Sequence, residues 1–120
     1  MAAPFVAPPI PVWIAFPFAG GYANYGGSFQ TCQYMKDQHG IVHLRGLLTG
    51  PGGSVTVGTL PVGFRPLQNQ LMHGVGDYAG GQLPMRLDVT SGGSVNVSAA
   101  SGVAWGGGFL SLANLRFATT

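Results

Sequence analysis

Few residues in this chain could carry out catalysis. Acid–base chemistry needs titratable side chains close together, yet the 120 residues include three Asp, no Glu and three His. Asp88 follows Arg86 by two positions, which in a strand places both on one face and predicts a surface ion pair. Asp37 falls in a predicted turn, and the spacing of the carboxyl groups does not suggest a glycosidase pair. We therefore expect a protein that is not an enzyme.

The histidines and the single cysteine do not form a metal-binding pattern. A turn and a strand are predicted to separate His39 from His43, and neither these nor His73 has a Cys or carboxylate co-ligand nearby. Three copies of one histidine could still meet on a threefold axis. Cys32 cannot form an internal disulfide, and its strand-like surroundings predict a small buried residue. We expect neither a metal nor another cofactor.

Residues suited to binding a sugar occur in glycine-rich segments. Aromatic faces can stack on sugar rings, and nearby Asp or Asn side chains can bond the hydroxyl groups, so loops that hold both can form shallow sites. The candidate ligand-binding residues are Tyr22, Asn24, Tyr25, Asp77, Tyr78 and Trp105. The alternative is that these rings cap the core or line a subunit interface.

Short strands must position these candidates. Apolar and polar residues alternate within short runs, and turn residues recur roughly every 8 to 12 positions, as in sandwiches and barrels. The predicted strands cover 29–35, 41–48, 54–57, 70–75, 85–90, 94–98 and 109–117, with 76–81 as a loop. No segment has helical periodicity. The pattern predicts an all-β fold, an antiparallel β-sandwich of jelly-roll type over residues 28–120.

Residues 1–27 differ from the rest and predict an extended apolar arm and loop. Five prolines interrupt the apolar stretch at its start, which carries no Lys or Arg. Proline fixes φ and removes a backbone donor, so neither a signal peptide nor a membrane helix is expected. Such an arm needs a groove on its own domain, on a neighbouring subunit or on a larger assembly. Its candidate anchoring or interface residues are Phe5, Val6, Ile10, Val12, Trp13 and Ile14.

Charge is scarce throughout the chain. Charged residues make up 7% of it, against roughly 25% in an average soluble domain, while 46% of residues are hydrophobic. The five Lys and Arg residues are scattered, which argues against nucleic-acid binding. A solitary monomer of this composition would expose apolar surface, so we expect an assembly that covers it.

Two motifs resemble a pattern found in structural proteins of tailed bacteriophages. The first is the hairpin sequence QYMKDQHGIVHLRG at 33–46, and the second is LPVGFRP at 60–66. The run LSLANLRF at 110–117 is similar to the last strand of that pattern. The resemblance covers residues 28–118.

The resemblance implies a small β-sandwich head domain, commonly trimeric, displayed on a virion that assembles in the host cytoplasm. Such heads bind host-surface saccharides in tail fibres and baseplates, and similar trimers decorate capsids. Because the chain starts at Met1 with a Pro-rich arm and no shaft, we expect a separate subunit anchored by its arm to other virion proteins. A capsid decoration protein and a free-standing lectin are the alternatives.

The second motif makes physical sense as a rigid corner. Pro61 and Pro66 fix the chain direction, and Gly63 can adopt a positive φ. Phe64 can anchor the corner in the core, and Arg65 can bind backbone carbonyl groups or an Asp.

Overall fold

The computed structural model describes residues 12–50, 55–78, 81–98 and 108–120. All the regular secondary structure in these ranges consists of β-strands. No helix long and apolar enough to cross a membrane is found among the described residues. In chain order the strands are β1 (Ile14–Ala15), β2 (Ala23–Asn24), β3 (Gln33–Lys36), β4 (Ile41–Arg45), β5 (Leu47–Thr49), β6 (Val55–Thr59), β7 (Gln70–Tyr78), β8 (Gly81–Val89), β9 (Ser94–Ser98), β10 (Phe109–Ser111) and β11 (Arg116–Ala118).

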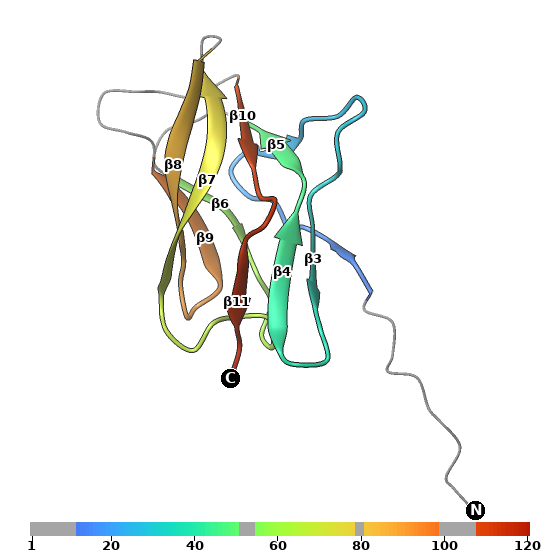
Figure 1. Cartoon of the computed structure of the whole chain (residues 1–120), viewed down its shortest axis with the longest axis vertical. Helices are drawn as coiled ribbons and strands as arrows, with labels where there is room; N and C mark the ends of the chain where they lie inside the picture. Colours follow the sequence, from blue (N-terminus) through green and yellow to red (C-terminus); the bar gives the residue numbers. More distant parts are fainter. Residues whose placement is uncertain (1–11, 51–54, 79–80, 99–107) are drawn as a thin grey trace, which may run out of the picture.

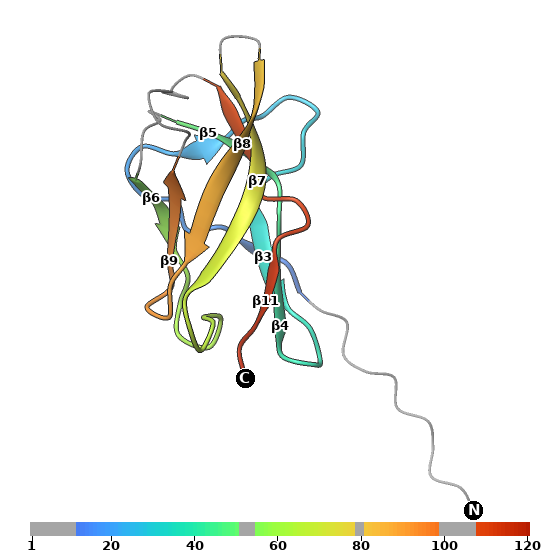
Figure 2. The same cartoon turned by 60° about the vertical axis from the view of Figure 1, so that its left-hand side comes forward.

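The strands form two antiparallel sheets, so the predicted all-β sandwich is confirmed. One sheet has the order β1-β3-β4-β11, and the other has the order β2-β5-β10-β7-β8-β9-β6. Figure 1 shows the long β7–β8 hairpin on one side of the molecule and the β3–β4 hairpin on the other, and in the turned view of Figure 2 β7 and β8 cross the middle of the molecule with β9 and β6 to their left. The C-terminus lies at one end, and the last residues of β7 lie at the opposite end (Figure 1).

The core is built from the alternating positions that the sequence indicates. Met85, Leu87 and Val89 on β8 are almost inaccessible to solvent. Between them, Arg86 and Asp88 point outward, and their side chains form the predicted ion pair, with Nε 2.9 Å from Oδ1. Each buried Leu or Val stabilises the fold by about 1.5–3 kcal/mol, whereas an exposed ion pair contributes about 0–1 kcal/mol. Apolar burial therefore dominates.

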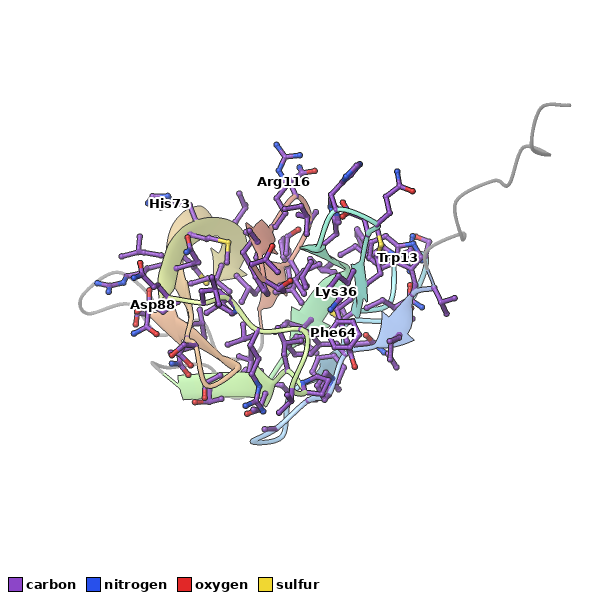
Figure 3. All side chains as sticks on the ribbon, turned by 90° about the horizontal axis from the view of Figure 1, so that it is seen from below. Trp13, Lys36, Phe64, His73, Asp88 and Arg116 are labelled. Carbon is purple, nitrogen blue, oxygen red and sulfur yellow. The ribbon has the colours of Figure 1, made fainter. Side chains whose placement is uncertain are left out.

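The predicted corner at 60–66 is confirmed in its details. Gly63 has a φ of 96°, and the Arg65 Nε donates a hydrogen bond to the Leu60 carbonyl oxygen at 2.8 Å. The Phe64 ring makes an edge contact with Tyr34, at 5.0 Å between ring centres. The Lys36 Nζ lies over the Phe64 ring and donates to the Gly63 carbonyl, and Figure 3 shows Lys36 and Phe64 next to each other. Two residues of β3, Tyr34 and Lys36, therefore hold the corner on that strand.

The prediction of one long strand over 109–117 is wrong. The chain forms β10, a turn in which the Leu115 N–H donates to the Leu112 carbonyl at 3.3 Å, and then β11. Asn114 in this turn has a positive φ of 67°. The two strands belong to different sheets. The apolar residues on both faces of this run therefore reflect a chain that changes sheets, not a central strand.

The prediction of a loop over 76–81 is also wrong. β7 continues to Tyr78, and β8 begins at Gly81. A Cβ atom on Gly74 would lie 2.5 Å from Leu87 Cδ1, and one on Gly76 would lie 2.6 Å from the Met85 sulfur. These glycines mark close packing of β7 against buried side chains of β8 and do not mark a turn.

Residues 14–24, which the sequence assigned to the arm region, contribute to both sheets. β1 pairs with β3, and β2 pairs with β5. Between these strands, Phe16 and Tyr22 are buried in the core. Residues 1–11 lie outside the described residues.

The prediction of one strand over 41–48 is wrong in the same way as that over 109–117, because the chain passes between the sheets at Gly46, which separates β4 from β5. Gly46 has a φ of 113°, and its carbonyl accepts a hydrogen bond from the Leu112 N–H at 2.9 Å. A Cβ atom on Gly46 would lie 2.6 Å from both the Cys32 nitrogen and the Thr31 oxygen. Because backbone atoms cannot rotate away as a side chain can, only glycine fits here.

We expect Gly46→Ala to destabilise the protein by about 3 kcal/mol or more, because it adds a backbone collision to an unfavourable φ. The measurement is chemical denaturation followed by circular dichroism. Gly63→Ala is the matched control, since Gly63 has a similar φ of 96° and nothing within 4 Å of its Cβ position. It should lose only about 1–2 kcal/mol. Equal losses in the two variants would show that the contact with Cys32 is unimportant.

Candidate functional site

Two of the predicted ligand-binding residues have structural roles. Tyr22 is 5% exposed and belongs to the core. The Asn24 side-chain oxygen accepts a hydrogen bond from the Cys32 backbone N–H at 2.7 Å. For Tyr22 the structure agrees with the alternative in which aromatic rings cap the core.

Tyr25 lies at the surface, in the middle of an aromatic cluster. Its ring meets Phe29 and Phe109 edge-on, with centroid distances of 5.5 and 5.8 Å. Tyr25 is 45% exposed and Phe29 is 55% exposed, and the Tyr25 N–H is bound to the Leu47 carbonyl at 2.9 Å. The three rings, called the aromatic cluster below, present an apolar surface of fixed shape.

The sequence did not identify Phe29 or Phe109 as site residues. Each belonged to a predicted strand, and periodicity does not reveal which loop a strand residue will meet. The strand order β2-β5-β10-β7 brings Phe109 beside Tyr25. The only earlier signal was that Phe29 follows shortly after Tyr25 in a glycine-rich segment.

The remaining predicted ligand residues lie near this end of the seven-stranded sheet or outside the described residues. The backbone of Asp77 is paired with Phe109, and Tyr78 follows as the last residue of β7. The side chains of Asp77 and Tyr78 are outside the described part of the structure, and so is Trp105.

The candidate anchoring residues divide in the same way. Phe5, Val6 and Ile10 lie outside the described residues. Val12 is 73% exposed, and Ile14 forms part of β1. The Trp13 ring packs against the Arg45 guanidinium, with Cζ 3.9 Å from the ring centre.

A second surface feature lies over the four-stranded sheet, where β4 and β11 pair. His43 on β4 is directly opposite Arg116 on β11, and both line two hollows of about 440 and 410 Å³. The larger one, called the arginine hollow, is lined by His43, Leu44, Arg45, Ala113, Asn114, Leu115 and Arg116. Arg116 projects from the body of the protein in Figure 3. The smaller hollow contains Asp37.

The side chains of Asp37 and His43 lie within ion-pair distance of each other, and both line the smaller hollow. The His43 Nε2 lies 2.9 Å from Asp37 Oδ2, and Asp37 Oδ1 accepts hydrogen bonds from the backbone N–H groups of His39 and Ile41. The bond to His43, and next the backbone bond from Ile41, lower the pKa of Asp37 to about 2. In the described ranges, no group of three or more His, Cys, Asp or Glu could hold a metal ion.

The fold is similar to two solved structures from bacteriophages. The crystal structure of the receptor-binding protein of Listeria phage PSA matches with a TM-score of 0.74 and 14% identity, over 92% of this chain. The head domain of lactococcal phage bIL170 matches with a TM-score of 0.65 and 20% identity, over 91% of this chain and 98% of that domain. This chain spans 66% of the Listeria phage protein, slightly less than two-thirds. No protein-family model and no curated protein matches the sequence.

At these identities the comparison shows the fold. The chain has the fold of phage receptor-binding head domains, and the resemblance drawn from the hairpin and corner motifs is confirmed at that level. The motifs lie in β3–β4 and in the corner that packs on β3. They therefore report the geometry of the sandwich.

The Asp37 carboxylate should make stability depend on acid pH. Its pKa of about 2 in the folded state lies below the ordinary value near 4, so its stabilising effect is complete above about pH 4 and is lost as the pH falls toward 2. Asp37→Asn keeps an oxygen for the two backbone N–H groups but removes the charge. Melting temperatures measured between pH 2 and 5 should fall more steeply for the wild type. Parallel curves would contradict this role.

Proposed function

We propose that this protein is the receptor-binding head of a tailed-phage tail, a non-enzymatic virion subunit that binds a host-surface saccharide. The main support is the match of more than nine-tenths of the chain to the receptor-binding protein of a Listeria phage and to the head domain of a lactococcal phage. The exposed aromatic cluster supports the same role, because rings of this kind stack on sugars. It lies near the end of the molecule opposite the C-terminus (Figure 1).

We also propose that the head is a homotrimer. Leu71 and Val75 on β7 are 54% and 52% exposed, and they flank His73 on one face of the strand. Exposed apolar side chains in a row, on a protein with only 7% charged residues, need a cover. Packing of the β7 faces of neighbouring copies would supply it.

The N-terminal arm is the proposed anchor to other virion proteins. The described part of the arm begins at Val12, which is mostly exposed, and the chain enters β1 two residues later. β1 and the contact of Trp13 with Arg45 hold the end of the arm on the head. Residues before Val12 can therefore bind another protein without disturbing the sandwich.

Truncation of the arm tests the anchor. Deletion of residues 2–11 keeps Trp13 and β1, and it should give a folded protein that remains trimeric by light scattering. The truncated protein should no longer join particles when infected cells supply it in place of the full chain. Incorporation at wild-type levels would refute anchoring by the arm. Electron microscopy of tagged particles separates the locations, since label on the capsid would favour a decoration protein over a tail head.

Substitution of Tyr25 tests the saccharide surface. Tyr25→Ala should weaken binding to isolated host cell walls by about two- to tenfold per site, because an aromatic contact contributes about 0.5–1.5 kcal/mol. Leu67→Ala is the control, since Leu67 is 69% exposed in the segment that follows the corner. Equal binding by both variants would contradict a role for the aromatic cluster. Glycan binding by a protein that never joins particles would instead favour a free-standing lectin.

A further inference from the structure

His73 is an exposed histidine in the middle of an apolar row. It lies on β7 between Leu71 and Val75, which are 54% and 52% exposed and, by the alternation of a strand, share its face. His73 is exposed as well, and Figure 3 shows it at the periphery of the molecule. Its imidazole forms no hydrogen bond or ion pair with any residue that the structure describes. No partner within the same copy therefore fixes its charge.

The row lies on a part of β7 that has no paired strand on one side. β8 pairs with the whole of β7, whereas β10 pairs with it only at Gly76 and Asp77. Within the described ranges, no other strand pairs with residues 70–75 on the β10 side. A second copy is the occupant that fits this surface, because its own β7 presents the same uncovered apolar row.

The charged groups around His73 leave no free carboxylate for it. Arg86 on β8 is directly opposite His73, and Asp88 is opposite Leu71. The Asp88 carboxylate is occupied by Arg86 through a forked contact, with distances of 2.9 and 3.1 Å. The other neighbour of β7 is β10, Phe109–Ser111, which contains no titratable side chain. A proton on His73 therefore adds a positive charge beside an arginine.

The rest of the chain offers little to balance that charge. The protein contains three Asp and no Glu. Asp37 is bound to His43 on the four-stranded sheet, and the side chain of Asp77, on β7 itself, lies outside the described part of the structure. A neighbouring copy would bring the same set of groups. Burial of a charge without a partner in an apolar contact is strongly unfavourable.

We propose that the proton on His73 controls the association of the heads. With a neutral imidazole, the β7 faces of neighbouring copies pack and cover Leu71 and Val75. With an imidazolium, the copies separate, because the contact would bury a positive charge close to Arg86 and to the same imidazolium of the other copies. The inference rests on the homotrimer proposed above.

The direction of the pH dependence follows from proton binding. Imidazole side chains gain a proton as the pH falls from 8 to 5. Separated copies bind this proton and the trimer excludes it, so the separated state holds more protons. Association is therefore strong at the upper end of this range and weakens as the pH falls toward the lower end.

The test is sedimentation equilibrium of the full-length protein at pH 8.0 and 5.5, with EDTA present. We expect trimers at pH 8.0. At pH 5.5 the concentration at which half of the protein is trimeric should be higher by about tenfold or more, since each copy takes up a proton on leaving the trimer. Circular dichroism should show intact sheets at pH 5.5, because Asp37, with its pKa of about 2, keeps its charge there.

Substitutions of His73 separate its charge from its size. His73→Gln is neutral at both pH values and should remain trimeric at both, whereas His73→Lys is charged at pH 8.0 and should be monomeric there. The matched controls lie in the β3–β4 turn, where Gln38 and His39 are exposed. His39→Gln should keep the pH dependence of the wild type, and Gln38→Lys should remain trimeric at pH 8.0.

The outcomes distinguish this inference from the proposed homotrimer. A trimer equally stable at both pH values, or a pH dependence that persists in His73→Gln, would overturn the role of His73 and leave the homotrimer standing. A monomer at both pH values would overturn the homotrimer and this inference with it. Dissociation of the trimer by EDTA at pH 8.0 would assign the histidines to a metal ion and would also overturn control by a proton.

Discussion

The contact between the backbones of Gly46 and Cys32 determines how the chain passes from one sheet to the other. Because no side chain fits between them, β4 can leave the four-stranded sheet at Gly46 and continue as β5. The Gly46 carbonyl then binds the Leu112 N–H, which couples this passage to that of β10 into β11. Arg45 directly precedes Gly46, and Asn114 lies in the second passage. The arginine hollow therefore lies where the chain passes between the two sheets.

Scarcity of charge makes each charged side chain informative. In a typical domain most charges lie on the surface and contribute little to stability. Here the Arg65 guanidinium closes a corner, the Lys36 ammonium binds the same corner, and Asp37 orders the β3–β4 turn. The solvation that charges usually provide is missing, and exposed Leu71 and Val75 are left on β7. The scarcity of charge and the exposed apolar residues on β7 both agree with the proposed assembly of several copies.

Local patterns predicted the elements but not their partners. Alternation identified β8 and β9, and turn residues identified the β3–β4 hairpin and the corner, because each depends on neighbours in sequence. A glycine marks a turn at Gly40 and close packing at Gly76, and the sequence alone does not distinguish the two. The position of Arg116 opposite His43, and of Phe109 beside Tyr25, depends on pairing between distant strands. The site residues that the sequence missed are of this second kind.

Burial of Cys32 has a practical consequence for chemical labelling. The thiol is 2% exposed, and burial raises its pKa to about 12, so almost none of it is the reactive thiolate at neutral pH. It is also the single cysteine of the chain. A cysteine introduced at an exposed position, such as Val62, would react with maleimide probes without removal of the native one. Fluorophores or spin labels can thus be attached to the otherwise unaltered protein.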